Sequence, residues 1–361
     1  MSETVYTIES IFRTAAKVDA SDIYLSPSST PILRVKNEFK KIAGNPMTVE
    51  ECNNLILSSM NPSQQAEFIE KRDFDYAINL DGIGRFRVNV FVASGAYELV
   101  ARLVAGTPRD ITTLFLPESI TDIADKERSG LIVVTGATGS GKTSTLAGII
   151  DRINATRATK IVTIEDPIEI VHKNKRSSVS QRELYADTLS FSAALRAAMR
   201  QRPDVILIGE MRDAETVSTA IGASESGHLV LSTLHSINAM ETIGRMLDFY
   251  PQDEQQQVRN LLSNTLRAVI SQRLVVDEEG QTRPLVEVMT QTLRIQEAIR
   301  DPEKTHDLNE IMNESSYDNM QTFEGHLIHM VSDGILTPER ALGYAENRHE
   351  MERKLKQSSL M

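Results

Sequence analysis

Apolar and polar positions follow two different patterns along the chain. In the first hundred residues, short β-rich segments separated by turn residues predict strands at 22–25, 32–35, 74–80, 85–92 and 97–104. Residues 8–18 and 48–59 have apolar positions at helical spacing, and the second segment begins with Thr48 and Glu51 in the spacing of a capping box. This part of the chain is therefore predicted to be a small α+β domain whose last three strands form an antiparallel meander.

A second pattern begins near residue 111, where apolar β-rich runs alternate with segments of helical spacing. The runs 131–135, 161–164, 205–208 and 229–234 predict strands, and 143–153 and 192–201 predict helices. This alternation is typical of a parallel α/β sheet. The breaker residues of 105–110 predict a linker between the two regions. After about Pro284 the sequence becomes more polar and helical, with a helix start at Thr337 and Pro338.

Composition narrows the choice of function. The chain of 361 residues is long enough for two domains. Its formal net charge of −11 argues against a protein whose main surface binds the phosphate backbone of a nucleic acid. The single cysteine, Cys52, excludes an intramolecular disulfide and an all-cysteine zinc site. The first 30 residues lack the apolar core of a signal peptide, and no apolar run approaches 18 residues. We therefore expect a cytoplasmic protein without direct membrane insertion.

One glycine-rich segment carries the strongest chemical signal. It fits the P-loop pattern at every fixed position, follows the apolar run 131–135 and opens the predicted helix 143–153. Backbone N–H groups of such a loop close around phosphate, and the helix N-terminus adds a favourable dipole. The lysine would reach the β- and γ-phosphates of ATP, and the threonine hydroxyl would ligate Mg²⁺. The nucleotide-binding residues are Gly136, Ala137, Thr138, Gly139, Ser140, Gly141, Lys142, Thr143 and Ser144.

Three other predicted strands end in polar residues. Glu165 and Asp166 follow the run 161–164, and Glu210 follows 205–208. Ligands of open α/β sheets bind at the carboxyl ends of strands, so Glu165 and Glu210 are candidates for holding Mg²⁺ or polarising the attacking water. An acidic turn before Pro167 and an ordinary surface glutamate remain the alternatives.

Histidines bracket the last of these strands. His228 and His235 are seven residues apart, an odd separation that places them on opposite faces of a regular strand, so they are not expected to ligate one metal. His235, at the carboxyl end, suits contact with the γ-phosphate. A structural role is the alternative for His228.

Several arginines could neutralise phosphate charge. Arg85, Arg87 and Arg102 lie in the predicted meander, and Arg196 and Arg200 share a face of the predicted helix 192–201. Surface ion pairs are the alternative for each of them.

Four segments in fixed order, 136–143, 162–170, 204–213 and 227–235, resemble the Walker A, Asp-box, Walker B and His-box motifs of secretion-superfamily ATPases. The PilT/PilU branch, the type IV pilus retraction motors, is the most similar. The segment 20–25 resembles that branch's N-terminal motif with Tyr24 in place of histidine, and 266–274 resembles one of its helices. Residues 298–301 match three of the four residues of the AIRN motif found in the C-terminal region of that branch.

This resemblance implies a domain plan and a chemistry. It implies a PAS-like N-terminal domain at 1–104, a linker at 105–117, a RecA-like P-loop ATPase core at 118–290 and a helical C-terminal region at 291–361. It implies Glu165, Glu210 and His235 as catalytic residues, Thr143, Glu165 and Glu210 around Mg²⁺, and Arg85, Arg87 and Arg102 as possible arginine contacts.

The resemblance also implies an assembly and a role. We expect a homohexamer that docks on an inner-membrane pilus platform protein, with a paralogous retraction ATPase as a candidate second partner, and that powers pilus retraction and twitching motility. Residues 292–315, which include Ile299 and Arg300, are the predicted retraction-specific coupling region. A type II secretion or pilus-extension ATPase is an alternative, although these are longer and usually carry a tetracysteine zinc site. A nucleic-acid motor and a non-hydrolysing adaptor are further alternatives, and no nucleic-acid partner is expected.

Overall fold

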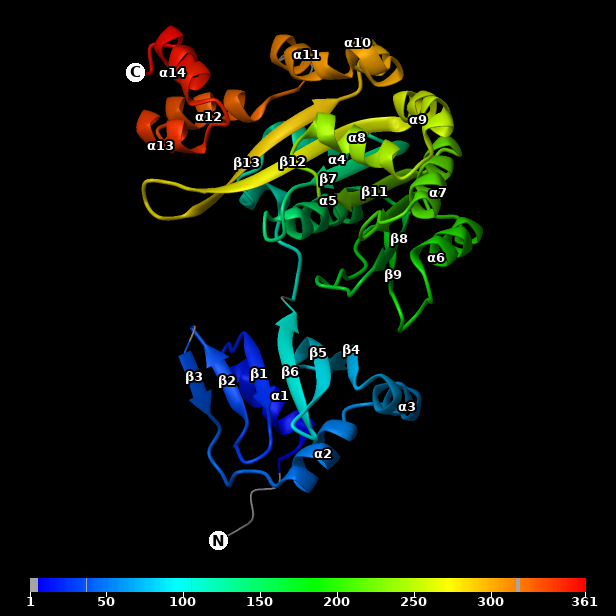
Figure 1. Cartoon of the computed structure of the whole chain (residues 1–361), viewed down its shortest axis with the longest axis vertical. Coiled ribbons are helices and arrows are strands. Elements are labelled where there is room, and N and C mark those ends of the chain that lie inside the picture. The colour runs from blue at the N-terminus through cyan, green and yellow to red at the C-terminus, as the bar shows by residue number, and fades with distance from the viewer. Residues whose placement is uncertain (1–5, 37, 105, 316–318) are drawn as a thin grey trace. The chain divides into compact units, whose positions relative to one another are not determined.

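The computed structural model divides the chain into two compact units, Met1–Thr107 and Pro108–Met361 (Figure 1). The structure describes residues 6–36, 38–104, 106–315 and 319–361. Among these residues, no helix is both long enough and apolar enough to cross a membrane.

The N-terminal unit is an antiparallel sheet with three helices. Its strands lie in the order β3-β2-β1-β6-β5-β4. The elements are α1 (Ile8–Lys17), β1 (Asp22–Leu25), β2 (Ile32–Val35), β3 (Glu38–Lys41), α2 (Val49–Leu57), α3 (Pro62–Lys71), β4 (Asp73–Leu80), β5 (Gly84–Ala93) and β6 (Ala96–Val104).

Sequence periodicity located most of this unit. The predicted strands 22–25 and 32–35 match β1 and β2, and the Thr48–Glu51 capping box is present, with Glu51 N 3.2 Å from Thr48 Oγ1. The strand β3 was missed because all four of its residues are exposed, which leaves no apolar alternation to detect. The helix α3 was missed because Phe68 is its only fully buried residue.

The C-terminal unit contains a seven-stranded sheet and most of the helices. Its strands are β7 (Gly130–Thr135), β8 (Lys160–Glu165), β9 (Ser178–Glu183), β10 (Val205–Ile208), β11 (Leu229–Leu234), β12 (Leu266–Val276) and β13 (Thr282–Thr290). Its α-helices are α4 (Glu118–Lys126), α5 (Lys142–Thr156), α6 (Phe191–Ala198), α7 (Ala214–Glu225), α8 (Ala239–Asp248), α9 (Gln252–Thr265), α10 (Leu293–Arg300), α11 (Leu308–Glu314), α12 (Phe323–Ser332), α13 (Pro338–Tyr344) and α14 (Arg348–Gln357).

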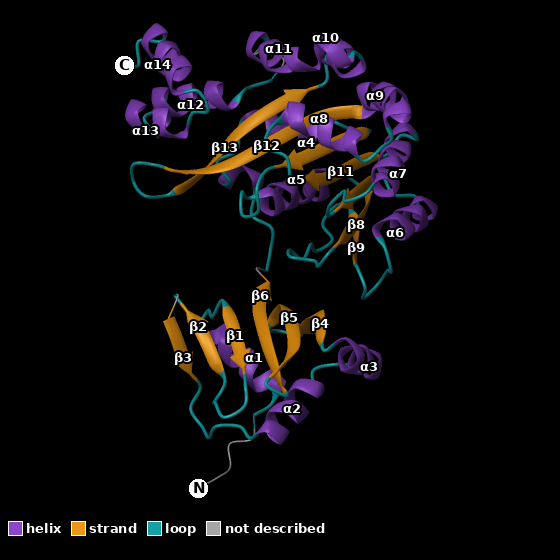
Figure 2. Ribbon diagram, in the orientation of Figure 1, coloured by secondary structure: helices purple, strands orange, loops and turns teal. Residues whose placement is uncertain are grey.

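This sheet positions the candidate site. Its order is β13-β12-β7-β11-β10-β8-β9, and every neighbouring pair is parallel except β12 with β13. Helices cover both faces (Figure 2): α4 and α5 pack on one face, and α6 to α11 contribute to the core on the other. Strands buried on both faces carry almost only apolar residues. Polar side chains therefore gather where the strands end.

Two predictions for the end of the sheet were wrong. Residues 266–274, expected to be a helix from the family resemblance, form most of strand β12, which pairs with β7 on one side and β13 on the other. Residues 284–290, expected in the helical region, belong to β13. Val269 and Ile270 are β-branched and fully buried on opposite faces of the sheet, an arrangement that favours a strand.

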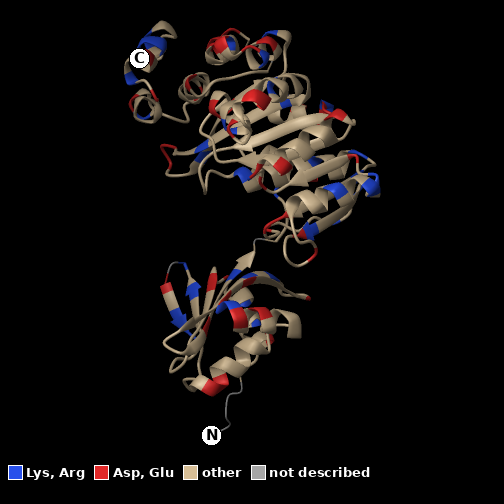
Figure 3. Cartoon of the chain, turned by 45° about the vertical axis from the view of Figure 1, so that its right-hand side comes forward, with Lys and Arg blue, Asp and Glu red and all other residues tan. Residues whose placement is uncertain are grey.

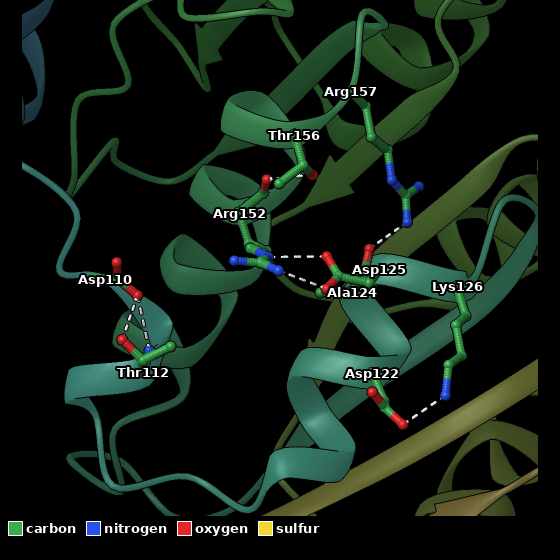
Figure 4. A network of polar contacts seen from close by, with 9 residues as sticks. All are labelled: Asp110, Thr112, Asp122, Ala124, Asp125, Lys126, Arg152, Thr156 and Arg157. Carbon is green, nitrogen blue, oxygen red and sulfur yellow. Dashed lines mark hydrogen bonds and ion pairs between the residues drawn. The ribbon is translucent and has the colours of Figure 1, made fainter.

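The predicted linker also ends earlier than expected. Ala105 lies outside the described residues, and the second unit begins at Pro108. Ile111, in a 3₁₀ turn, is buried in the core formed with α4 and α5. Figure 4 shows how α4 is fixed on α5: the Arg152 guanidinium donates to both carboxylate oxygens of Asp125, at 2.9 and 2.7 Å. Residues 111–117 therefore belong to the C-terminal unit.

Candidate functional site

A cavity of about 520 Å³ lies at the carboxyl edge of the seven-stranded sheet. Four successive parallel strands contribute to its wall: β7 through the P-loop, β11 through His235, β10 through Glu210 and β8 through Glu165. Parallel strands place their carboxyl ends at one edge, so residues separated by up to a hundred positions meet there. The predicted P-loop, acidic residues and His235 are thus brought together in one cavity.

Glycine is required in the P-loop for steric and conformational reasons. Gly136, Gly139 and Gly141 have φ values of 142°, 81° and 93°, in the region that L side chains rarely adopt. A Cβ atom on Gly136 would collide with the Gln272 carbonyl oxygen and with Ser140 Oγ. The helix α5 begins directly after Gly141, so its free N–H groups face the loop. The loop is therefore shaped to receive phosphate oxygens.

The Lys142 ammonium is held inside its own loop. Lys142 Nζ donates to the carbonyl oxygens of Gly136, at 2.7 Å, and Ala137, at 3.0 Å. Burial lowers the pKa of Lys142, and the carboxylates of Glu210 and Glu169 oppose this shift. A bound polyphosphate would offer charged acceptors, which form stronger hydrogen bonds than these carbonyls.

Glu165 has the environment of a proton acceptor. Its Oε1 accepts hydrogen bonds from Thr163 Oγ1 at 2.6 Å and from Gln181 Nε2 at 3.1 Å. Burial raises the pKa of Glu165, and the two hydrogen bonds oppose this rise. A carboxylate whose pKa is raised accepts a proton from water more readily than one with an ordinary pKa.

Glu210 is the centre of a charged cluster. Arg212 Nε donates to Glu210 Oε2 at 2.7 Å, and Arg212 Nη1 donates to Asp166 Oδ2 at 3.3 Å. His235 Nε2 lies 3.4 Å from Glu210 Oε1. Both oxygens of Glu210 are therefore directed by neighbours, and its carboxylate has a defined orientation in the cavity wall.

Sequence reasoning missed two residues of these networks. Arg212 stands two positions after Glu210, and Gln181 lies on β9 and also accepts from the backbone N–H of His172 at 2.7 Å. The charge of Arg212 beside an acidic strand end was a usable signal. Nothing in the local sequence identified Gln181, because its contact with Glu165 depends on the pairing of β8 with β9.

The donor set fits magnesium. Mg²⁺ in nucleotide sites takes few protein ligands and keeps water and phosphate oxygens as the others. The Thr143 hydroxyl and the carboxylates of Glu165 and Glu210 all line the cavity. Within the described residues no cluster of three or more His, Cys, Asp or Glu side chains could hold a metal ion by itself.

Three of the remaining arginine candidates have acidic partners within their own unit. Arg102 Nε donates to Asp22 Oδ1 at 2.9 Å and Arg87 Nε lies 4.0 Å from Asp75 Oδ1, both within the N-terminal unit. Participation of Arg85, Arg87 and Arg102 in the site stays a prediction. Arg196 pairs with Glu215 on α7.

His228 lies at the other end of β11 from His235. Its Nδ1 is 3.0 Å from the Ala223 carbonyl oxygen, an arrangement that matches the structural alternative.

Comparison with known proteins supports the nucleotide-site interpretation. The chain is 38% identical to a twitching motility protein of Neisseria gonorrhoeae, with 96% of this chain and 92% of the relative aligned. It is 35% identical to the type IV pilus ATPase PilU of Pseudomonas aeruginosa, with 97% and 92% aligned. The crystal structure of the pilus retraction motor PilT with bound ADP matches with a TM-score of 0.87 and 38% identity, over 96% of this chain and 99% of that one.

These matches confirm the predicted resemblance to the PilT/PilU branch of secretion ATPases. The model of the family described as type II/IV secretion system protein matches residues 2–339. A match over most of the chain, together with relatives aligned over nearly their whole length, shows that this chain is a member of the type II/IV secretion system protein family.

Proposed function

We propose that this chain is an ATP-hydrolysing motor that powers type IV pilus retraction. The observation that carries the proposal is the single cavity in which the P-loop, Glu165, Glu210 and His235 meet at the carboxyl edge of one sheet. The near-complete alignment with a pilus retraction motor that binds ADP supports the same activity.

The proposed chemistry assigns a role to each group that lines the cavity. Lys142 and the backbone N–H groups of the P-loop bind the phosphates, and Thr143, with Glu165 and Glu210, would hold Mg²⁺, which supplies charge neutralisation at the phosphates. Glu210 orients the attacking water, and Arg212 fixes the direction of its carboxylate. Glu165 is the second catalytic carboxylate, and its raised pKa suits it to accept a proton. His235 lies beside Glu210 and is placed to contact the γ-phosphate.

The proposed assembly is a homohexamer. In this proposal the N-terminal unit, an antiparallel sheet with α2 and α3 inserted between β3 and β4, is PAS-like, and the C-terminal unit is RecA-like. Arginines of the N-terminal unit complete a site of the same or a neighbouring subunit. The hexamer docks on an inner-membrane platform protein from the cytoplasmic side, and a paralogous retraction ATPase is the candidate second partner.

A nucleic-acid motor receives no support from the charge distribution. In the view of Figure 3, basic and acidic residues are interspersed over both units, in agreement with the net charge of −11. A DNA-translocating surface would instead need a positive groove with aromatic side chains.

The predicted coupling residues need correction. Ile299 lies on α10 with its side chain fully buried in the hydrophobic core. Arg300 Nη2 lies 3.4 Å from Ser263 Oγ. Replacing Ile299 would therefore disturb packing rather than a partner contact, whereas the Arg300 side chain is exposed. Within the segment 292–315, Leu293 is another side chain that suits a coupling role, because it is apolar and 79% exposed at the start of α10.

The test combines enzymology with pilus dynamics. A strain that lacks the gene should accumulate pili that do not retract, and a strain carrying Lys142→Ala should have the same phenotype because phosphate binding is lost. Loss of pili in these strains would instead indicate an assembly motor. Retraction at the normal rate in the Lys142→Ala strain would contradict the proposal.

A further inference from the structure

Three polar residues lie side by side on the neighbouring strands β7, β12 and β13, next to the P-loop. Ser271 on β12 is paired with Thr135 on β7 and, on its other side, with Glu287 on β13. Paired residues of neighbouring strands point to the same face of a sheet. Thr135 is the last residue before Gly136, so this row begins at the base of the nucleotide loop. All three residues are buried, at 4% exposure or less.

Glu287 connects this row to the helix that follows His235. Its Oε1 accepts hydrogen bonds from the backbone N–H of Ala239 at 2.8 Å and from Ser271 Oγ at 3.2 Å. Ala239 is the first residue of α8, and only four positions separate it from His235. The carboxyl group therefore fixes the end of the short loop that carries His235.

The surroundings of Glu287 make its charge state sensitive to pH. Burial raises the pKa of Glu287 to about 7, against the hydrogen bonds from Ala239 and Ser271, and the carboxylates of Glu324 and Glu346 raise it further. His326 on α12 is neutral at this pH, because burial lowers its pKa to about 4 and its Nδ1 accepts from Val286 N at 2.9 Å. Arg273, on β12, forms an ion pair with Glu346.

We propose that Glu287 is a positioning residue of the ATPase site, which holds the first turn of α8, and with it the His235 loop, most firmly when its carboxyl group is ionised. This inference rests on the proposed function. A carboxylate at a helix N-terminus forms a charge-assisted hydrogen bond and interacts favourably with the helix dipole, whereas the protonated acid accepts more weakly. Ser271 is also the strand partner of Thr135, so β12 lies directly beside the strand that leads into the P-loop.

The two consequences of ionisation have opposite signs. Because the pKa in the folded protein is above that of an unfolded glutamate, Glu287 stabilises the fold at low pH and this contribution is lost as the pH rises through about 7. Ordering of the His235 loop should improve over the same interval. The free energy of unfolding therefore decreases over the same pH interval in which the active site becomes better ordered.

The test compares the full-length wild type with Glu287→Gln, which keeps the shape and fixes a neutral group. The ratio of wild-type to variant kcat should be near one at pH 6 and rise to about tenfold at pH 8, the difference between a charged and a neutral hydrogen bond. The KM for ATP should change by less than about twofold, because the phosphate-binding residues are untouched. A kcat ratio that is the same at every pH would reduce Glu287 to a structural role and overturn the proposal.

A second variant and a second readout keep the proposal falsifiable. Glu324→Gln removes a repelling carboxylate, so the inflection in kcat should move to lower pH; an inflection that does not move contradicts the assignment. The NMR signal of the His235 Cε1–H proton, assigned with His235→Gln, should follow the titration of Glu287 in the wild type and lose that inflection in Glu287→Gln. Since this readout needs no turnover, an absent ATPase activity contradicts the proposed function, whereas an unchanged His235 titration contradicts the role of Glu287.

Discussion

The two sheets of this molecule bury their strands differently. In the N-terminal unit, β4 and β5 have buried, half-buried and exposed residues along each strand, whereas every residue of β7, β10 and β11 in the C-terminal unit is buried. A sheet that is open on one face can carry charged side chains anywhere along that face. A sheet covered on both faces exposes polar groups to a ligand at its strand ends, and this confines the nucleotide chemistry of the C-terminal unit to one edge.

The difference gives the charged residues of the two units different roles. Arg87 and Arg102 stand opposite each other on neighbouring strands and have acidic partners on the same sheet. Glu165, Glu210 and His235 come from three strands and face one cavity. Substitutions at the strand ends should therefore change catalysis, and substitutions on the open face should act first through their acidic partners on the same sheet.

The largest effect is expected at Glu165. Glu165→Gln should lower kcat by about 10²–10⁴-fold, the usual range for a lost proton acceptor, with the thermal midpoint little changed. Glu169→Gln is the matched control, because Glu169 lines the same cavity without the hydrogen bonds to Thr163 and Gln181 that define Glu165. Steady-state hydrolysis of both variants measures the difference. Equal losses in the two variants would show that cavity charge, rather than the position of Glu165, matters.

The second prediction compares a buried and an exposed residue of α10, to distinguish a role in packing from a role in coupling hydrolysis to retraction. Ile299→Ala should lower the free energy of unfolding by about 2–5 kcal/mol, since it removes a fully buried side chain. Leu293→Ala, at an exposed position of the same helix, should stay within about 0.5 kcal/mol of the wild type. Denaturant titration gives both values. If Leu293→Ala preserves hydrolysis but stops retraction, coupling lies on the exposed surface of α10; unchanged retraction places it elsewhere.

The sequence predicted the site better than its surroundings for a physical reason. Each strand-end residue of the cavity follows a short apolar run, so Glu165, Glu210 and His235 could be placed from local pattern alone. Contacts that depend on pairing between distant strands, such as Gln181 with Glu165, have no local signal. The segment 266–274 was expected as a helix from the family resemblance alone, and its pairing with β7 and β13 shows that it is part of the strand β12.

A smaller effect is expected at the open face of the N-terminal sheet. Arg102→Ala leaves the Asp22 carboxylate, whose side chain is only 5% exposed, without its cationic partner, and should cost about 1–3 kcal/mol of stability. Charge-matched Arg102→Lys should recover part of this loss. If Arg102 also completes a neighbouring site, mixing inactive Arg102→Ala and Lys142→Ala chains should restore measurable hydrolysis. No recovery on mixing would confine its role to its own subunit.

The most direct test of the account is the behaviour of Glu210→Gln, because Glu210 is the residue through which Arg212 and His235 are connected in the cavity. Binding of a fluorescent ATP analogue and single-turnover hydrolysis should be measured on the same preparation with Mg²⁺. The account predicts nucleotide affinity within a few-fold of the wild type and a hydrolysis rate lower by about 10²–10⁴-fold. Hydrolysis by Glu210→Gln at a rate near that of the wild type would contradict the claim that chemistry depends on the carboxyl ends of these strands.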